Sequence, residues 1–165
     1  MSSEKSTKKF IEYIEIFTDG SCMKKKTDIY CGYGVYFPNG ELSNISKKFT
    51  IKPLTNQRSE LYAIYRGIKK ITTNFDFSTI MIYSDSEYSI KSLTIWIKNW
   101  KKNGWLTAQK KTVLNVDIIQ KIDTIMEKYK NKIKFTHVKA HTGNQDILSK
   151  NNDIADKLAK DGAML

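Results

Sequence analysis

Two apolar runs of similar design stand out along the chain, and each ends on an aspartate. Residues 14–18, apart from Glu15, are apolar, aromatic or β-branched and lead to Asp19, followed by Gly20-Ser21. Residues 80–84 repeat the pattern and lead to Asp85. Such runs are typical of strands, and small residues are expected to end them. If the two strands are neighbours, two carboxylates meet at one edge of a sheet.

The remaining pattern alternates strand-like and helix-like segments. Apolar residues recur at helical spacing in four segments, and the segment at 23–28 is charged and expected to be a loop. Pro38-Asn39-Gly40 predicts the tight turn of a hairpin. The predicted elements are a hairpin over 32–51, helices over 55–71, 86–100 and 113–129, a strand over 133–138, and a final helix after a polar loop at 141–150. This order predicts a flexible tail at 1–10 and one α/β domain with a mixed sheet at 11–165.

Charge adds a candidate partner. The 165 residues carry 28 Lys+Arg against 17 Asp+Glu, a formal net charge of +11. This excess favours polyanions, nucleic acid first, although lysines that only solvate the surface would give the same composition. Cys22 and Cys31 are too few for a metal cluster or a disulfide framework and are expected to be reduced, without a role. No hydrophobic leader or membrane-length apolar run is present, which predicts a soluble intracellular protein.

Two further acids lie on predicted helices. Glu60 falls in the first turn of the helix over 55–71, where the helix dipole alone would favour an acid. Asp156 lies at the border of the apolar face of the last helix, where pairing with a neighbouring lysine would explain it. Together with Asp19 and Asp85, however, these residues make four carboxylates from two strand ends and two helices. Two Mg²⁺ ions that cleave a phosphodiester require such a set of oxygen ligands.

The sequence, with these acids in this order, resembles type 1 ribonuclease H of the cellular, eukaryotic-like form. The resemblance implies a five-stranded mixed β-sheet flanked by α-helices. It also implies an endoribonuclease that hydrolyses the RNA strand of RNA/DNA hybrids and leaves 5′-phosphate and 3′-hydroxyl ends. The matching blocks occur in the family's order at residues 17–21, 32–35, 55–60, 83–86, 96–105, 137–143 and 152–159.

The resemblance also assigns catalytic roles. The block at 155–159 aligns Asp156, and not Asp153, with a ligand of the metals. His141 matches a mobile histidine that assists proton transfer or product release, whereas His137 alternates along a strand and is expected to be structural. The implied ligands of two Mg²⁺ ions, or of Mn²⁺, are Asp19, Glu60, Asp85 and Asp156.

Contacts to the hybrid follow from the same resemblance. Asn56 and Gln57 match residues that read the minor groove, where the 2′-hydroxyl distinguishes RNA, although helix-start polarity alone would also place them there. Thr55 and Asn115 match members of a DNA-phosphate pocket. The arginine of that pocket falls on Pro53, and the adjacent Lys52 is a candidate substitute.

A basic, aromatic segment resembles the family's basic protrusion, in which cations and flat rings suit a DNA strand. Tryptophans in the core are the alternative, and Trp105 is expected to be one of them. The residues predicted to contact the DNA strand are Trp96, Lys98, Trp100, Lys101 and Lys102.

Two departures from the family pattern are visible. Lys25 replaces an RNA-contacting asparagine, and the loop at 142–151 is longer than usual, with 145–148 as the expected extra residues. The predicted protein is a monomer that binds RNA/DNA hybrid and no membrane. The alternatives are another nuclease or transposase of the same fold, a hybrid-binding module without catalysis, and a domain separated from a reverse transcriptase.

Overall fold

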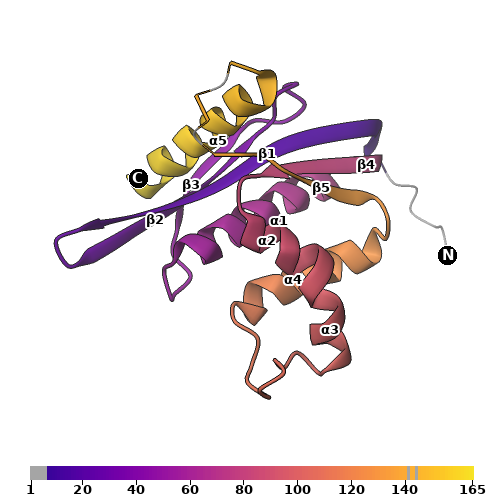
Figure 1. The fold of residues 1–165 in the computed structure, drawn as a ribbon. Helices are drawn as coiled ribbons and strands as arrows, with labels where there is room; N and C mark the ends of the chain where they lie inside the picture. The colour runs from indigo at the N-terminus through magenta and orange to yellow at the C-terminus, as the bar shows by residue number, and fades with distance from the viewer. Residues whose placement is uncertain (1–6, 141, 144) are drawn as a thin grey trace.

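The computed structural model describes residues 7–140, 142–143 and 145–165. Within them one mixed sheet has the strand order β3-β2-β1-β4-β5 (Figure 1). β1 pairs antiparallel with β2 and parallel with β4, β2 pairs antiparallel with β3, and β4 pairs parallel with β5. This confirms the predicted fold class. The strands are β1 (Lys9–Lys25), β2 (Asp28–Tyr36), β3 (Ile45–Phe49), β4 (Phe75–Ser84) and β5 (Ile133–His137).

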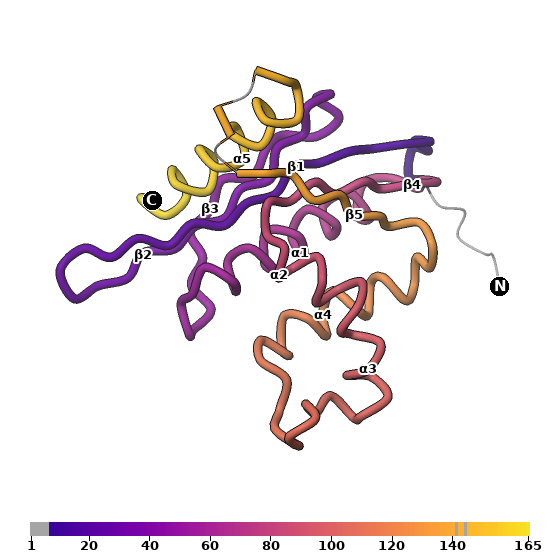
Figure 2. Tube along the Cα trace, viewed as in Figure 1, coloured from indigo at the N-terminus to yellow at the C-terminus, as the bar shows by residue number. Residues whose placement is uncertain are grey.

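Helices cover the two faces of the sheet unequally. On one face α1 (Asn56–Asn74) packs against β1 and β2, and α4 (Val116–Lys128) packs on α1. On the other face α5 (Ile147–Ala163) lies across β1, β2 and β3. The trace in Figure 2 shows α3 and the segment that follows it projecting from this body. The connection from β4 to α4 contains α2 (Glu87–Lys91), the π-helix η1 (Ser92–Trp96) and α3 (Ile97–Lys102).

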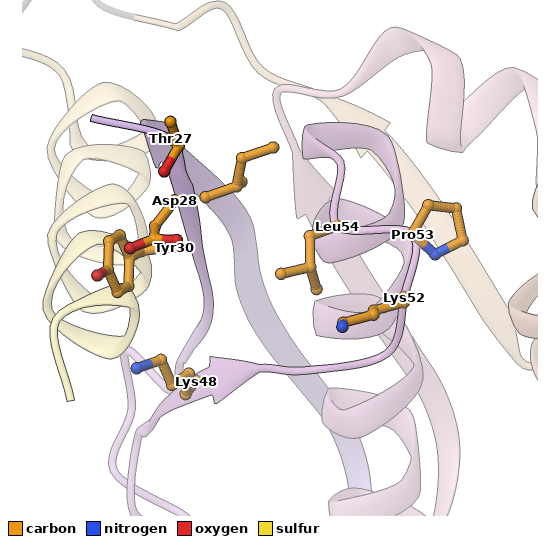
Figure 3. Close-up of a pocket in the computed structure, with 8 residues that line it drawn as sticks. Thr27, Asp28, Tyr30, Lys48, Lys52, Pro53 and Leu54 are labelled. Atoms are coloured by element: carbon orange, nitrogen blue, oxygen red, sulfur yellow. The ribbon is translucent and has the colours of Figure 1, made fainter. Parts of the chain in front are cut away.

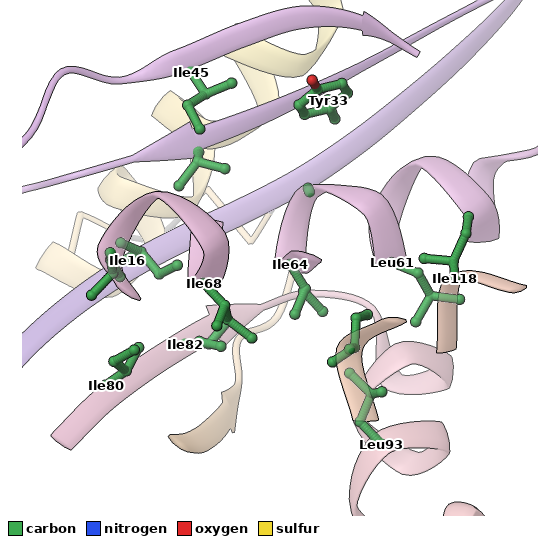
Figure 4. Packing of buried hydrophobic residues seen from close by; sticks show 14 of the residues in the cluster. Ile16, Tyr33, Ile45, Leu61, Ile64, Ile68, Ile80, Ile82, Leu93 and Ile118 are labelled. Atoms are coloured by element: carbon green, nitrogen blue, oxygen red, sulfur yellow. The ribbon is translucent and has the colours of Figure 1, made fainter. Parts of the chain in front are cut away.

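The main core lies between the sheet and α1. The predicted apolar stripe of α1 is fully buried and meets isoleucines of β1 and β4, including Ile16, Ile80 and Ile82 (Figure 4). Burying each such side chain is worth about 1.5–3 kcal/mol. A smaller cluster beneath α5 contains Phe17 and Ala155. These two cores hold both strand ends that carry the aspartates.

The first strand is longer than predicted. β1 begins at Lys9, inside the expected tail, and continues past Gly20-Ser21 to Lys25, so the expected charged loop at 23–28 is wrong. β2 pairs with β1 as far as Lys25, and only Lys26 and Thr27 separate the two strands. Gly20 serves close packing instead of a turn, because a Cβ there would collide with the backbone of Glu60 on α1.

The hairpin also changes the interpretation of the cysteines. Cys22 and Cys31 are directly paired across β1 and β2, with a Cα–Cα distance of 4.0 Å, and they form a disulfide. The prediction of two reduced cysteines is therefore wrong for this structure. The error follows from the misplaced loop, because only the extended hairpin brings these residues opposite each other.

Two other boundaries differ from prediction. The helix expected over 86–100 is split by η1, with Ser86 capping α2 through a hydrogen bond from the Ser89 amide (3.1 Å). α5 begins earlier than expected because Asp146 caps it, accepting from the Ser149 amide (2.9 Å), so 147–148 are helical and not extra loop. Within the described residues, none of the helices has the length and apolarity to cross a bilayer.

Candidate functional site

Three predicted carboxylates meet where β1, β4 and α1 converge. The parallel register pairs Thr18 with Ser84, so Asp19 and Asp85 follow side by side. The close approach at Gly20 brings the first turn of α1 against β1, which delivers Glu60 to the same point. One carboxylate oxygen from each of Asp19, Glu60 and Asp85 lies within 4.8 Å of the others. The structure therefore brings together three of the four predicted ligands.

These acids repel one another in a largely buried environment. Asp19 is 3% exposed, and burial together with the charge of Asp85 raises its pKa to about 8. Burial and the charges of Asp19 and Asp85 raise the pKa of Glu60 well above its ordinary value. One Glu60 oxygen, Oε2, is buried without a hydrogen-bond partner among the described residues. A divalent cation would relieve both the repulsion and this unsatisfied oxygen, so the donor set fits a metal.

Asp156 lies beside this group on α5. Its carboxylate interacts with Asp19 and contributes to the raised pKa of that residue. Asp156 also pairs with Lys160 one turn later, at 2.9 Å. Asp153 is exposed, and its charge acts on Lys160 only as a minor contribution. The fourth predicted ligand is thus adjacent to Asp19, with a lysine balancing its charge.

Sequence reasoning did not identify Asn152 as part of this site. Asn152 is 1% exposed, and its Nδ2 donates to Oδ2 of Asp85 (3.4 Å), while its Oδ1 is buried without a partner among the described residues. The available signal was its spacing, because Asn152 precedes Asp156 by one helical turn and shares its face. This amide orients the Asp85 carboxylate.

Of the two histidines, only His137 lies among the described residues. His137 Nε2 lies 3.2 Å from the backbone carbonyl oxygen of Asp85, and a carbonyl only accepts, so Nε2 carries the proton. This contact agrees with a structural role for His137. His141 lies outside the described residues.

The start of α1 carries three of the predicted hybrid contacts. Thr55 caps the helix, its Oγ1 accepting from the Arg58 amide (3.2 Å). Asn56 Oδ1 accepts from the Cys22 amide (2.9 Å), which leaves the Asn56 amide nitrogen available on the surface. Gln57 is exposed beside it. These polar groups lie three to five residues before Glu60, one turn of α1 from the acids.

Asn115 is buried and held by a network that sequence reasoning missed. Arg58 makes a two-point ion pair with Asp117, at 2.8 and 2.7 Å, and its Nη1 also donates to Oδ1 of Asn115 (3.5 Å). Asn115 Nδ2 in turn donates to the hydroxyl of Tyr88 (2.9 Å). A guanidinium only donates, so Arg58 fixes the Asn115 oxygen toward itself and the amide nitrogen away from itself. The network joins the starts of α1 and α4 to α2.

Lys52 borders a hollow of about 800 Å³ between the β1–β2 hairpin and the segment before α1. Figure 3 shows Lys52 and Leu54 on one side of it, facing Asp28 and Tyr30 on the other. The carbonyl of Lys52 accepts from Arg58 (3.3 Å), which ties this segment to the Asn115 network. The backbone of Lys52 therefore adjoins the predicted phosphate contacts, while its side chain lines the hollow.

In the basic segment, ring exposure and lysine pairing differ from residue to residue. Trp96 is 38% exposed, and its ring centroid lies 6.0 Å from that of Trp100. Lys98 and Lys102 are exposed. Lys101 instead pairs with Asp123 and Glu127 of α4, at 3.1 and 2.8 Å, so two acids already surround its charge. Trp105 packs against the core, as expected. Trp100, predicted to contact the DNA strand, is half-buried and packs against the same core.

Comparisons with known proteins identify the family of the chain. The RNase H family model matches residues 12–164. The chain is 39% identical over 163 residues to a probable ribonuclease H of Acanthamoeba polyphaga mimivirus, covering 97% of this chain and 68% of that protein. It is 36% identical over 157 residues to the ribonuclease H of Pectobacterium carotovorum subsp. carotovorum, covering 91% and 89%.

Solved structures give the same result at the level of the fold. The solution structure of the PFV RNase H domain superposes with a TM-score of 0.74 at 25% identity, covering 92% of this chain and 94% of that one. LC9-RNase H1, described as a type 1 RNase H with the type 2 active-site motif, gives a TM-score of 0.69 at 20% identity, covering 93% and 72%. Because the family match spans nearly the whole chain and relatives over 30% identical align over most of their length, this chain belongs to the RNase H family.

Proposed function

We propose that this protein is a metal-dependent endoribonuclease that hydrolyses the RNA strand of RNA/DNA hybrids. The observation that carries the proposal is the convergence of Asp19, Glu60 and Asp85, three mutually repelling acids with one unsatisfied buried oxygen. A binding module without catalysis has no use for such a costly arrangement, which supports an enzyme over that alternative.

Asp19, Glu60, Asp85 and Asp156 would hold two Mg²⁺ or Mn²⁺ ions. When bound, such ions supply a lower pKa for an attacking water and stabilisation of the leaving oxygen. The role of the chain is to hold the ligands in place. Asn152 orients Asp85, and Lys160 limits the negative charge at Asp156. His141 would exchange a proton with the leaving group or with the departing product, and its loss is expected to lower kcat by about ten- to a thousandfold.

Substrate selection would be divided between two surfaces. Asn56 and Gln57 would contact the minor groove beside the acids, where the 2′-hydroxyl identifies the RNA strand. Thr55 and the amide nitrogen of Asn115 would hold a phosphate of the DNA strand, with Lys52 nearby in place of the missing arginine. The exposed groups of the basic segment, Trp96, Lys98 and Lys102, would follow the DNA strand further on, with the half-buried Trp100 supporting the ring of Trp96.

A cleavage assay with four labelled substrates tests the proposal. RNA/DNA hybrid, RNA duplex, DNA duplex and single-stranded RNA are each incubated with and without Mg²⁺, beside the Asp85→Asn variant as the matched control. We expect cleavage of the hybrid alone, only with metal, and only by the unaltered protein. Binding of hybrid without cleavage would favour the non-catalytic module, and cleavage of DNA duplex would favour another nuclease of the fold.

A further inference from the structure

A second charged surface lies along the C-terminal half of α1, away from the acids. Two hollows of about 560 and 430 Å³ flank this part of the helix and share Lys69 and Thr73. Lys69 lies nine residues after Glu60, which is about 14 Å along a helix axis. Every charged side chain among the described residues that line the two hollows is cationic. We call four of these residues the cationic stripe: Lys47 of β3 and Arg66, Lys69 and Lys70 of α1.

The contacts of the stripe do not neutralise its charge. Lys70 Nζ donates to the carbonyl and hydroxyl oxygens of Ser43, at 2.5 and 2.8 Å, and Arg66 hydrogen-bonds the hydroxyl of Tyr33. Both partners are neutral. In the part of the chain that the structure describes, none of the ion pairs includes a stripe residue. Burial lowers the pKa of Lys70, and the nearby charges of Arg66 and Lys47 lower it further, so these cations repel each other.

Other helices of this lysine-rich protein are charged differently. On α5 both Lys157 and Lys160 pair with an acid one turn away, and on α2 Lys91 pairs with Glu87. The segment of α1 from 61 to 74 contains no acid at all. The stripe therefore differs from the paired lysines of α5 and α2, whose charge a neighbouring acid balances.

The helix dipole does not account for the stripe. Cations gain from the dipole in the last turn of a helix, and α1 has none there. Arg66, Lys69, Lys70 and Thr73 instead follow the spacing i, i+3, i+4, i+7, which places them on one face over about 10 Å. Along one strand of a duplex, phosphates follow every 3.4 Å or so of the axis, and such a face spans about three of them.

We propose that the cationic stripe binds the sugar–phosphate backbone of a nucleic acid duplex, at a site separate from the groove that contains the acids. The hydroxyl of Ser43 and the side-chain amides of Asn44 and Asn74 line the same hollow and can donate to phosphate oxygens. Single-stranded nucleic acids bind mainly by stacking their bases on exposed aromatic rings. Among the described residues, none of the strongly exposed aromatic side chains lines either hollow, which favours a duplex over a single strand. The stripe thus holds a second duplex, or a distant turn of a long one.

The test uses the Asp19→Asn protein, which prevents cleavage during the measurement. A labelled DNA duplex is titrated in the presence of a saturating, unlabelled short RNA/DNA hybrid, with and without Lys47→Gln, Arg66→Gln and Lys69→Gln together. The control variant removes three positive charges from another part of the surface, by Lys130→Gln, Lys132→Gln and Lys134→Gln. Thermal unfolding of each variant checks that it is folded, since all six side chains lie on the surface.

We expect the labelled duplex to stay bound when the hybrid is saturating. The stripe variant should lower the slope of log affinity against log salt by up to about 2.7, and the control variant should lower it much less. Hybrid that displaces all of the duplex, or a stripe variant that binds as the parent does, would overturn the proposal. Polyglutamate that displaces the duplex as well as unlabelled DNA does would assign the stripe to acidic proteins instead. Cleavage of hybrid by the metal-loaded parent is measured separately, so a failure of the proposed function is distinguished from a failure of the stripe.

Discussion

The two ends of α1 carry opposite excesses of charge, and they differ in what that excess costs the fold. At the start of the helix, Glu60 is pressed against Asp19 and Asp85 with one oxygen unsatisfied. Further along, Arg66, Lys69 and Lys70 are also alike in charge but are wholly or partly in contact with water. Burial amplifies repulsion because protein screens charge less well than water does. The buried end is therefore costly, as expected of a functional site, and the exposed end is inexpensive and adjustable.

The largest expected effect comes from removing charge at the buried end. Asp19→Asn, Glu60→Gln or Asp85→Asn should each lower the rate of hybrid cleavage by at least about a hundred- to a thousandfold, the usual effect of losing one essential electrostatic contact. Single-turnover cleavage measures the rate, and hybrid affinity should change little. Asp153→Asn is the control on α5 and should be nearly as active as the parent. An inactive Asp153→Asn beside an active Asp156→Asn would reverse the assignment of the fourth ligand.

The same charges should oppose folding when no metal is present. Because the pKa of Asp19 is raised to about 8, the folded protein binds more protons than the unfolded chain between pH 4 or so and pH 8. The stability of the metal-free protein should therefore fall as the pH rises through this window. Thermal unfolding in EDTA at several pH values measures this trend. Glu60→Gln should flatten the trend and raise the melting temperature at neutral pH, and Mg²⁺ should raise it in the parent but not in the variant.

The Arg58–Asp117 ion pair joins a buried side chain to an exposed one, and so lies between the buried acids and the exposed cations of α1. The Arg58 side chain is 4% exposed, whereas that of its partner Asp117 is 53% exposed. Asp117→Asn leaves the buried guanidinium without its counterion, and after allowance for solvent screening it should cost about 1–3 kcal/mol of unfolding free energy. Denaturant unfolding measures the cost. Asp161→Asn, which removes the acid of the exposed Lys157–Asp161 pair on α5, is the control and should cost much less.

The pH dependence of this pair has the opposite sign to that of the acids. Arg58 lowers the pKa of Asp117, so the pair contributes its stability above the ordinary aspartate pKa and loses it as the pH falls below about 4. The difference in stability between the parent and Asp117→Asn should therefore shrink in acid. A constant difference down to low pH would show that the ion pair is not its source.

The sequence predicted what periodicity and strand ends determine, and missed what depends on tertiary pairing. Apolar spacing located the core face of α1, and the two runs ending at Asp19 and Asp85 predicted adjoining carboxylates because parallel neighbours share an edge. The extension of β1 was missed because lysine-rich residues are poor strand formers alone, and here the partner strand decides. The Cys22–Cys31 disulfide was missed for the same reason, because only the extended hairpin places the two cysteines opposite each other. Asn152 escaped notice because its one local sign was its spacing from Asp156, and its burial depends on contact with another element.

The smallest expected effect, and the finest test of the comparison, lies among the exposed lysines of the basic segment. Lys101 is already surrounded by Asp123 and Glu127, whereas Lys102 beside it is exposed and has no ion pair among the described residues. A lysine that contacts a phosphate lowers the slope of log affinity against log salt by about 0.9 when it is removed. Lys102→Gln should therefore reduce the slope for hybrid binding by up to that amount, and Lys101→Gln by much less. Binding isotherms of the Asp19→Asn protein at four salt concentrations measure both slopes without cleavage. Equal reductions would mean that Lys101 leaves its acids to reach the DNA strand, and that exposed ion pairs on this surface do not predict which cations bind nucleic acid.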